Sequence, residues 1–155
     1  WSCAKSISAS RKAKGEEYPK TGREQSDGMN KLNLILTIPP SVNHCYKNFT
    51  CMGRRNRVLT PLARAWKEEA YYIANALAHR EGWRVPEPEE KIVLEVFAFW
   101  PDGRRRDMNN THKLLCDALE GALYLDDKMV LVRDMDFSVD RKRPRLEVCV
   151  YVKDD

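Results

Sequence analysis

The chain has 155 residues, which is enough for one hydrophobic core but not for two. Its apolar fraction of 43% and charged fraction of 32% are those of an ordinary globular domain, and its net charge of +4 excludes a uniformly basic coat. No apolar stretch approaches the roughly 18 residues of a membrane span, so we expect no membrane association. The five cysteines are scattered and odd in number, which excludes a regular disulfide framework and favours free thiols in a cytoplasmic protein.

Residues 1–28 differ in composition from the rest of the chain. They are rich in Ser, Lys, Glu and Gly and show no apolar periodicity, which predicts a flexible tail. Met29 directly precedes the first apolar run, so the native chain is expected to start there, with the tail as upstream sequence. Residues 29–155 are then expected to form one folded domain.

The first half of this domain is predicted to contain a strand, a loop and a long helix. Residues 31–38 form an apolar run that favours a strand, and Pro39-Pro40 ends it. Residues 41–59 are interpreted as a loop. Thr60-Pro61 is typical of a helix start, a hydroxyl N-cap followed by proline at the first helical position. Apolar side chains at three- and four-residue spacing continue this helix to about His79.

The second half is predicted to contain a central strand, a second helix and two further strands. Residues 91–100 are dense in β-branched and aromatic side chains, as in a strand buried on both faces. The second helix is expected from about 110 to 122, and the strands near 129–137 and 146–152. The order β-α-β-α-β-β predicts an α/β (α+β) fold, a mixed β-sheet with two main helices packed on it.

Basic residues gather in three islands on a chain that is otherwise nearly neutral. This uneven distribution suggests a polyanionic partner that is held at a few places. The alternative is that each island is merely solvated surface. The islands are Arg54, Arg55 and Arg57; Arg104, Arg105 and Arg106; and Arg141, Lys142, Arg143 and Arg145.

Three carboxylates stand in the turns at the two ends of the second helix. Asp107 precedes the helix, and Asp126 and Asp127 follow it. Because a helix of about twelve residues is ~18 Å long, they meet only if the chain returns along it. If they meet, their hard oxygen atoms favour Mg²⁺ or Mn²⁺ over zinc, and such an ion can activate water against a phosphoryl group. If they do not, the acidic pair is a polar turn, and Asn109 or Asn110 is a helix N-cap.

The order of motifs between Arg104 and Val130 resembles the RusA family of Holliday-junction resolvases. The matching pattern is an arginine-rich start, Asp-x-Asp-Asn-x-x-Lys, Asp-Ala-Leu, and an aromatic or aliphatic pair followed by Asp-Asp. A weaker similarity covers nearly all of residues 31–152. The resemblance implies a RusA-like nuclease domain and a homodimer that resolves branched DNA, four-way junctions, in DNA recombination and repair. The reaction expected is metal-dependent phosphodiester hydrolysis, in which water attacks in line and leaves 5′-phosphate and 3′-hydroxyl ends.

Carried over residue by residue, the resemblance makes Asp107 and Asp127 the catalytic, metal-binding carboxylates. Lys113 becomes the basic residue that catalysis needs, and Asp126 becomes a neighbouring acidic residue of the metal site. Two further residues match supporting positions. These are Asn110 and Asp117.

Asn109 departs from the family's pattern, which often has a second aspartate at this position. An amide oxygen can coordinate Mg²⁺ or Mn²⁺ but brings no negative charge, so we expect a weaker metal site. A natural variant with a weak site, an engineered inactivation, and a shifted ligand set that uses Asp102 or Asp117 all stay open.

DNA is expected to be gripped by its backbone and by junction shape, at the first two basic islands and at Arg141, Lys142 and Arg143. Tyr46, Phe49 or Trp100 either wedges against exposed bases or packs in the core or an interface. Two rival functions differ in class. One is a protein of the same fold that binds branched DNA without cutting it, as Asn109 suggests, and the other is an ordinary domain that binds proteins.

Overall fold

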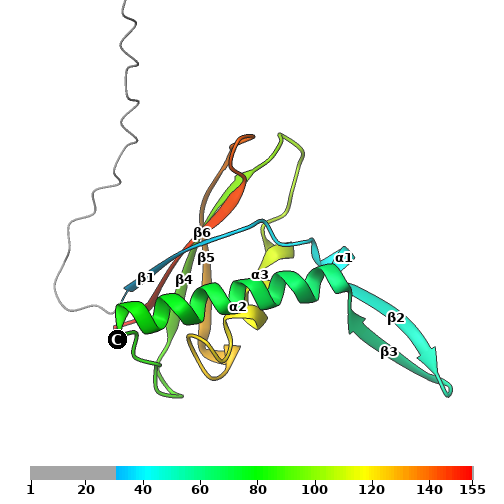
Figure 1. Ribbon diagram of the computed structural model, residues 1–155, viewed down its shortest axis with the longest axis horizontal. Helices are drawn as coiled ribbons and strands as arrows, with labels where there is room; N and C mark the ends of the chain where they lie inside the picture. Colours follow the sequence, from blue (N-terminus) through cyan, green and yellow to red (C-terminus); the bar gives the residue numbers. More distant parts are fainter. Residues whose placement is uncertain (1–30, 155) are drawn as a thin grey trace, which may run out of the picture.

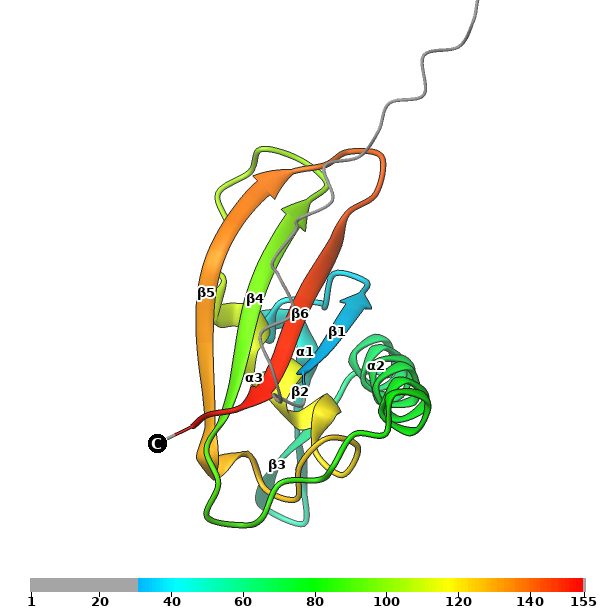
Figure 2. The same cartoon turned by 90° about the vertical axis from the view of Figure 1, so that its left-hand side faces the viewer.

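A four-stranded mixed sheet, in the order β1-β6-β4-β5, forms the centre of the fold (Figures 1 and 2). The computed structural model describes residues 31–154, so the prediction for residues 1–28 lies outside the described residues. β6 pairs antiparallel with both β1 and β4, whereas β4 and β5 run parallel. The strands are Lys31–Leu36 (β1), Ile92–Trp100 (β4), Val130–Val139 (β5) and Arg145–Val152 (β6).

Two helices cover one face of this sheet. They are α2, Pro61–Glu81, and α3, Asn109–Leu119. The register places the buried side chains of β1, β6 and β4 on the same face, as the partners Leu34, Val148 and Val96 show. α2 packs on β1 and α3, and its buried stripe consists of Trp66 and four alanines, Ala63, Ala70, Ala74 and Ala78. The predicted mixed sheet with two main helices is confirmed.

The ends of α2 follow the local signals in the sequence. The Thr60 hydroxyl accepts a hydrogen bond from the Ala63 amide at 3.3 Å, as expected of an N-cap ahead of a proline. At the other end Gly82 adopts a left-handed φ of 65°, which suits a residue without Cβ and closes the helix two residues beyond the predicted end. Within the described part of the chain, no helix is both long and apolar enough to cross a membrane.

The prediction of a loop over residues 41–59 is wrong. A short helix, Val42–Cys45 (α1), leads into a hairpin of Tyr46–Cys51 (β2) and Arg54–Leu59 (β3). Met52 and Gly53 form its tip with positive φ angles of 50° and 76°, as a two-residue hairpin turn requires. The hairpin projects away from the sheet, beyond the start of α2 (Figure 1). Its outer side chains pack against no core, so its sequence lacks the alternation of apolar and polar residues from which a strand is predicted.

Candidate active site

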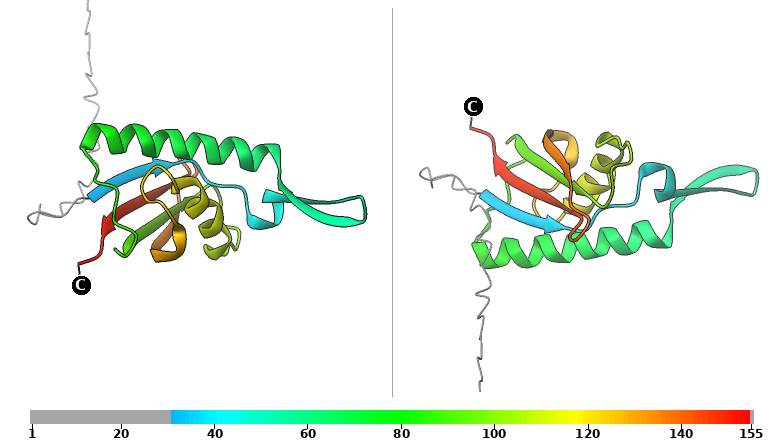
Figure 3. Two further views of the ribbon diagram at one scale, coloured as in Figure 1. Left: turned by 90° about the horizontal axis from the view of Figure 1, so that it is seen from below. Right: turned by 90° about the horizontal axis from the view of Figure 1, so that it is seen from above.

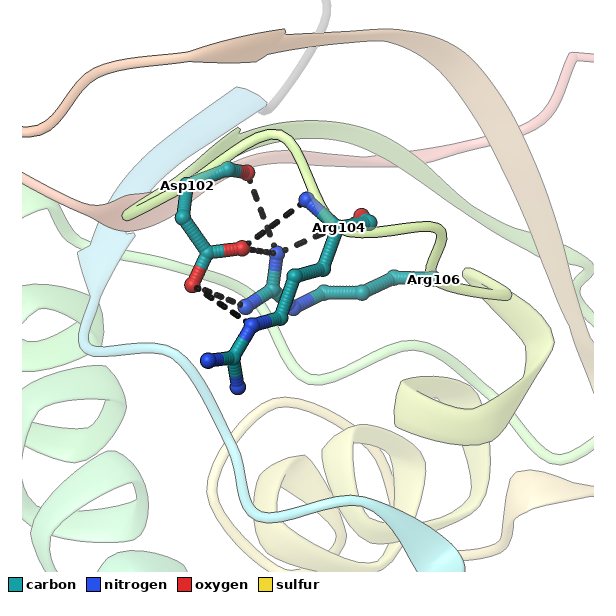
Figure 4. A network of polar contacts seen from close by, with 3 residues as sticks. All are labelled: Asp102, Arg104 and Arg106. Atoms are coloured by element: carbon teal, nitrogen blue, oxygen red, sulfur yellow. Dashed lines mark hydrogen bonds and ion pairs between the residues drawn. The ribbon is translucent and has the colours of Figure 1, made fainter.

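Asp102 organises the loop that connects β4 to α3 (Figure 4). Its two carboxylate oxygens accept hydrogen bonds from the Arg106 guanidinium at 2.7 and 3.0 Å, and the Arg104 amide donates to the same group at 3.0 Å. These contacts, first the Arg106 guanidinium and then the Arg104 amide, lower the pKa of Asp102 from 3.8 to about 2. The Arg106 guanidinium also lies over the Trp100 ring, 5.2 Å from its centroid. These non-covalent contacts therefore hold the loop that carries the second basic island against the end of β4.

Asp107 caps the start of α3 from upstream. Its carboxylate accepts a hydrogen bond from the Asn109 amide at 3.0 Å, and its carbonyl accepts one from the Asn110 amide at 3.2 Å. Met108, buried in the core, is the N-cap residue and gives no side-chain hydrogen bond. The alternative in which Asn109 or Asn110 caps the helix is therefore wrong. Because Met108 is held in the core, it is Asp107, one residue earlier, whose carboxylate accepts a hydrogen bond from the Asn109 amide. Asp107 itself stays exposed.

Lys113 lies on α3 one turn before Asp117. Its ammonium nitrogen is 3.6 Å from an Asp117 carboxylate oxygen, and its side chain is 60% exposed. This is an ordinary ion pair between side chains one helical turn apart, and it offsets the positive charge of the lysine only weakly. It keeps the ammonium group at the surface of α3, in the same helix that Asp107 caps.

The chain returns along α3 after the helix ends. The Tyr124 hydroxyl donates a hydrogen bond to the Cys116 carbonyl at 2.9 Å, which ties the returning loop to the helix. Burial, with the nearby Asp127 and Asp117 carboxylates, raises the pKa of the Cys116 thiol to about 11. The Asp127 carboxylate therefore acts electrostatically on Cys116, which follows Lys113 by three residues on α3.

Asp126 and Asp127 begin the connection into β5. Asp126 accepts a hydrogen bond from the Lys128 amide at 3.0 Å, and its second oxygen lies 3.2 Å from the Lys128 ammonium group. These contacts lower the pKa of Asp126. Asp127 opens a short 3₁₀ turn, Asp127–Met129, directly before the strand.

The candidate ligands are distributed along α3. Asp107 and Asn109 stand at its start, and Asp127 stands after it, where the chain enters β5, and acts electrostatically on Cys116. Within residues 31–154, no three side chains of His, Cys, Asp and Glu gather into a group that could hold a metal ion. The convergence of Asp107 with Asp127 therefore stays a prediction.

Comparison with known families assigns the chain. The sequence profile described as Endodeoxyribonuclease RusA matches residues 37–151, which is most of the chain. The chain belongs to the RusA endodeoxyribonuclease family. This membership implies nuclease activity of the kind that resolves Holliday junctions. No individual curated protein is similar enough in sequence to count as a match.

A second polar pair beside the RusA motif was missed from the sequence. The His112 Nε2 atom lies 2.7 Å from an Asp134 carboxylate oxygen, and the two side chains are 19% and 35% exposed. Asp134 lies on β5 opposite Val96, where the pairing of the two strands shifts by one residue. Such bulges re-aim side chains. His112 could have been singled out as a candidate site residue because it is next to Lys113, but nothing in the sequence indicated that its partner is Asp134.

Two of the three basic islands lie at one end of the sheet of this RusA-family fold (Figure 2). The Asp140 amide donates to the Trp100 carbonyl at 2.8 Å, which joins the β5–β6 turn to the end of β4. Each island has an inner arginine held by an aspartate: Arg106 by Asp102, and Arg145 by Asp140 at 2.9 Å. The exposed members, available to a polyanion, are Arg104, Arg105, Arg141, Lys142 and Arg143.

The hydrogen bonds that Asp102 accepts from Arg106 and Arg104, here called the Asp102 clamp, predict a pH-dependent contribution to stability. Because the pKa of Asp102 is lower in the folded protein, the clamp stabilises the fold above the unfolded value of about 3.8 and loses this effect as the pH falls towards about 2. Asp102→Asn lacks the charge at every pH. Urea unfolding should therefore show wild type more stable at neutral pH, with the difference shrinking as the pH drops to about 2. A difference that is constant with pH would contradict the assignment.

Proposed function

We propose that this RusA-family protein resolves four-way DNA junctions by hydrolysing one phosphodiester bond in each of two symmetry-related strands. One observation carries the proposal: α3 presents an exposed carboxylate, Asp107, at its start and an exposed ammonium group, Lys113, in its middle. The loop directly before this helix bears Arg104 and Arg105, both exposed. A DNA backbone drawn to these arginines would pass the carboxylate and the lysine.

The chemistry of the donor set suits a hard divalent cation. We propose that Asp107 and Asp127 hold Mg²⁺ or Mn²⁺, with Asp126 nearby and the Asn109 amide oxygen as a neutral ligand. Mg²⁺ in phosphoryl-transfer sites is commonly held by one or two carboxylates together with substrate phosphates and water. A site with few protein ligands therefore fits an ion that the DNA helps to bind. When bound, such an ion supplies charge neutralisation and an activated water.

Lys113 is proposed to act on the phosphate itself. In the reaction a water oxygen bonds to phosphorus and the water loses a proton to solvent, while the bond from phosphorus to the 3′ oxygen breaks and that oxygen takes up a proton from solvent as the 3′-hydroxyl. Negative charge builds on the phosphoryl oxygens between these events. An ammonium group at that position stabilises the transition state more than the ground state. Asp117 would position the ammonium group until DNA arrives, and Asn110, half-buried in the first turn, would support the start of α3.

Symmetric cutting needs two equivalent sites. A four-way junction offers two symmetry-related strands, and a two-fold homodimer presents two identical active sites to them. We therefore propose a homodimer, acting in DNA recombination and repair. The exposed basic residues at the end of the sheet would hold the flanking phosphates, and this binding should weaken steeply as salt rises.

A second candidate function rests on Asn109. This exposed amide stands where a negative charge would strengthen a metal site, so a protein that binds junctions without cutting them is the alternative.

A synthetic four-way junction, labelled on each strand, separates the two candidates. The nuclease should make paired cuts in Mg²⁺ or Mn²⁺ and leave a linear duplex of the same sequence intact. Tight binding of the junction with no cut in either ion would instead identify a junction-binding protein.

Replacing Lys113 should separate catalysis from binding. Lys113→Ala should slow cleavage by roughly 10²–10³-fold, the typical effect of removing one donor that stabilises the transition state, and leave the junction Kd nearly unchanged. Lys142→Ala is the matched control, because it also removes one lysine but from a turn proposed only to grip DNA. It should weaken binding slightly and cleavage in proportion. Equal losses of binding and cutting in Lys113→Ala would show that Lys113 is only a backbone contact.

Replacing Asn109 tests its place beside the metal. Asn109→Asp adds a negative charge at the proposed ligand position, so cleavage should reach half its maximum at a lower Mg²⁺ concentration. If the protein as it stands does not cut, the same change should restore cleavage. Asn110→Asp is the control, because it adds the same charge in the same helical turn and gains the same favourable effect of the helix dipole. Superimposable Mg²⁺ and Mn²⁺ titrations for Asn109→Asp and the original protein would remove Asn109 from the metal site.

A further inference from the structure

The β2–β3 hairpin is a rooted arm whose outer part contacts no core. Every residue from 47 to 58 is exposed, while Tyr46 and Leu59 at its base pack against the core. The Thr60 amide donates to the Cys45 carbonyl at 2.8 Å, and the Thr60 hydroxyl donates to the His44 carbonyl at 3.0 Å. Figure 3 shows the arm extending from the body in two views. Isolated two-stranded hairpins are marginally stable, so an arm of this length indicates a partner.

The charge of the arm identifies the class of partner. Residues 46–59 contain four basic side chains and no acidic one. The register places Arg55 opposite Thr50 on one face and Arg54 opposite Cys51 on the other, so both faces carry cations. Two such arms would repel each other, whereas a polyanion such as DNA would attract them. A hollow of about 390 Å³ along the arm is lined by Asn48, Phe49, Thr50, Arg55, Asn56 and Arg57.

The dimensions of the arm also fit DNA. Each strand has six residues, which span about 20 Å at the usual rise of a strand. A two-stranded ribbon is narrow enough to enter the major groove of a duplex, which is about 12 Å wide. The same width passes between two helical arms that separate at a branch point.

Met52 at the tip of the arm is placed at a cost to the fold. Its side chain is 98% exposed, and its backbone has a φ of 50°, a left-handed conformation that side-chain-bearing residues rarely adopt. Asparagine is the residue that this turn prefers, ahead of the glycine that follows at position 53. A methionine here therefore forgoes turn stability and exposes an apolar side chain. Proteins that kink DNA use methionine, among other apolar residues, as a wedge against bases.

We propose that the β2–β3 hairpin is a branch-point probe, in which Met52 packs against the base pair left open at a DNA junction. The inference rests on the proposed function only in taking branched DNA as the ligand. In a linear duplex every base pair is stacked on both sides, so insertion of Met52 costs unstacking of a step, a few kcal/mol. A branch point offers an open base-pair face without that cost. Met52 thus favours junctions over duplexes, while Arg54 and Arg55 add affinity for both.

The test measures binding without cleavage. Junctions and linear duplexes of the same sequence, with 2-aminopurine at the base pair flanking the branch, are titrated in EDTA. Wild type and Met52→Leu should change the 2-aminopurine fluorescence and prefer the junction. Met52→Asn should lose the change and about tenfold of the preference, equivalent to ~1.4 kcal/mol, with an unaltered duplex Kd. Val85→Asn, which replaces a 45% exposed apolar residue in the loop after α2, should behave as wild type.

The fold of the Met52→Asn variant is not at risk, because asparagine suits the turn, and urea unfolding should show it at least as stable as wild type. Unchanged junction preference and fluorescence in Met52→Asn would overturn the inference. A shift of oligomeric state in Met52→Asn, seen by sedimentation, would overturn it in favour of a contact with a second copy. Cleavage in Mg²⁺ is scored separately. If the wild type shows Met52-dependent fluorescence but never cuts, the proposed nuclease activity is refuted and the role of the hairpin stands. If Met52→Asn cuts junctions as specifically as wild type, the role of the hairpin is refuted and the nuclease activity stands.

Discussion

The parallel pairing of β4 with β5 is the constraint on which the rest of the molecule depends. Parallel neighbours cannot be joined by a tight turn, so the chain must cross the face of the sheet from the end of one strand to the start of the next. α3 makes this crossing, and every candidate catalytic residue lies on it or in the turns beside it. Asp107 stands where the crossing begins and Asp127 where it ends. The placement of the two carboxylates in the connections on either side of α3 is therefore a consequence of strand direction.

Carboxylates determine which arginines face solvent. At the end of the sheet, Asp102 holds Arg106 and Asp140 holds Arg145, and these arginines also lie over the rings of Trp100 and Phe99. The neighbouring basic side chains then project from a fixed loop. Preorganised cations lose less conformational entropy when they bind phosphate, so the ion pairs of Asp102 and Asp140 would favour the DNA contact that we propose for this surface.

The recognition and the chemistry that we propose lie on separate parts of the chain. The candidate chemistry is carried by α3 against the sheet, whereas the β2–β3 arm stands clear of it, rooted at Thr60. An arm that senses branch structure and a metal site with few protein ligands complement each other. If the ion is completed by DNA, then only DNA held in the right geometry completes the site, and selectivity for junctions extends from binding to cleavage.

The sequence by itself determined the four strands of the sheet and the two main helices, because each strand is a short run of apolar or β-branched residues and each helix repeats its apolar residues with the helical period. It also determined the family, since an ordered set of motifs over some 25 residues is far more specific than any single residue. Tertiary structure alone decided the rest. The arm of residues 46–59 was missed because an exposed hairpin has no buried face to set a period, and the pairing of His112 with Asp134 depends on a register shift that no local signal reports. The role of Asp102 depends on the folded position of the Arg106 guanidinium, and the role of Asp107 depends on the position of the Asn109 amide at the start of α3.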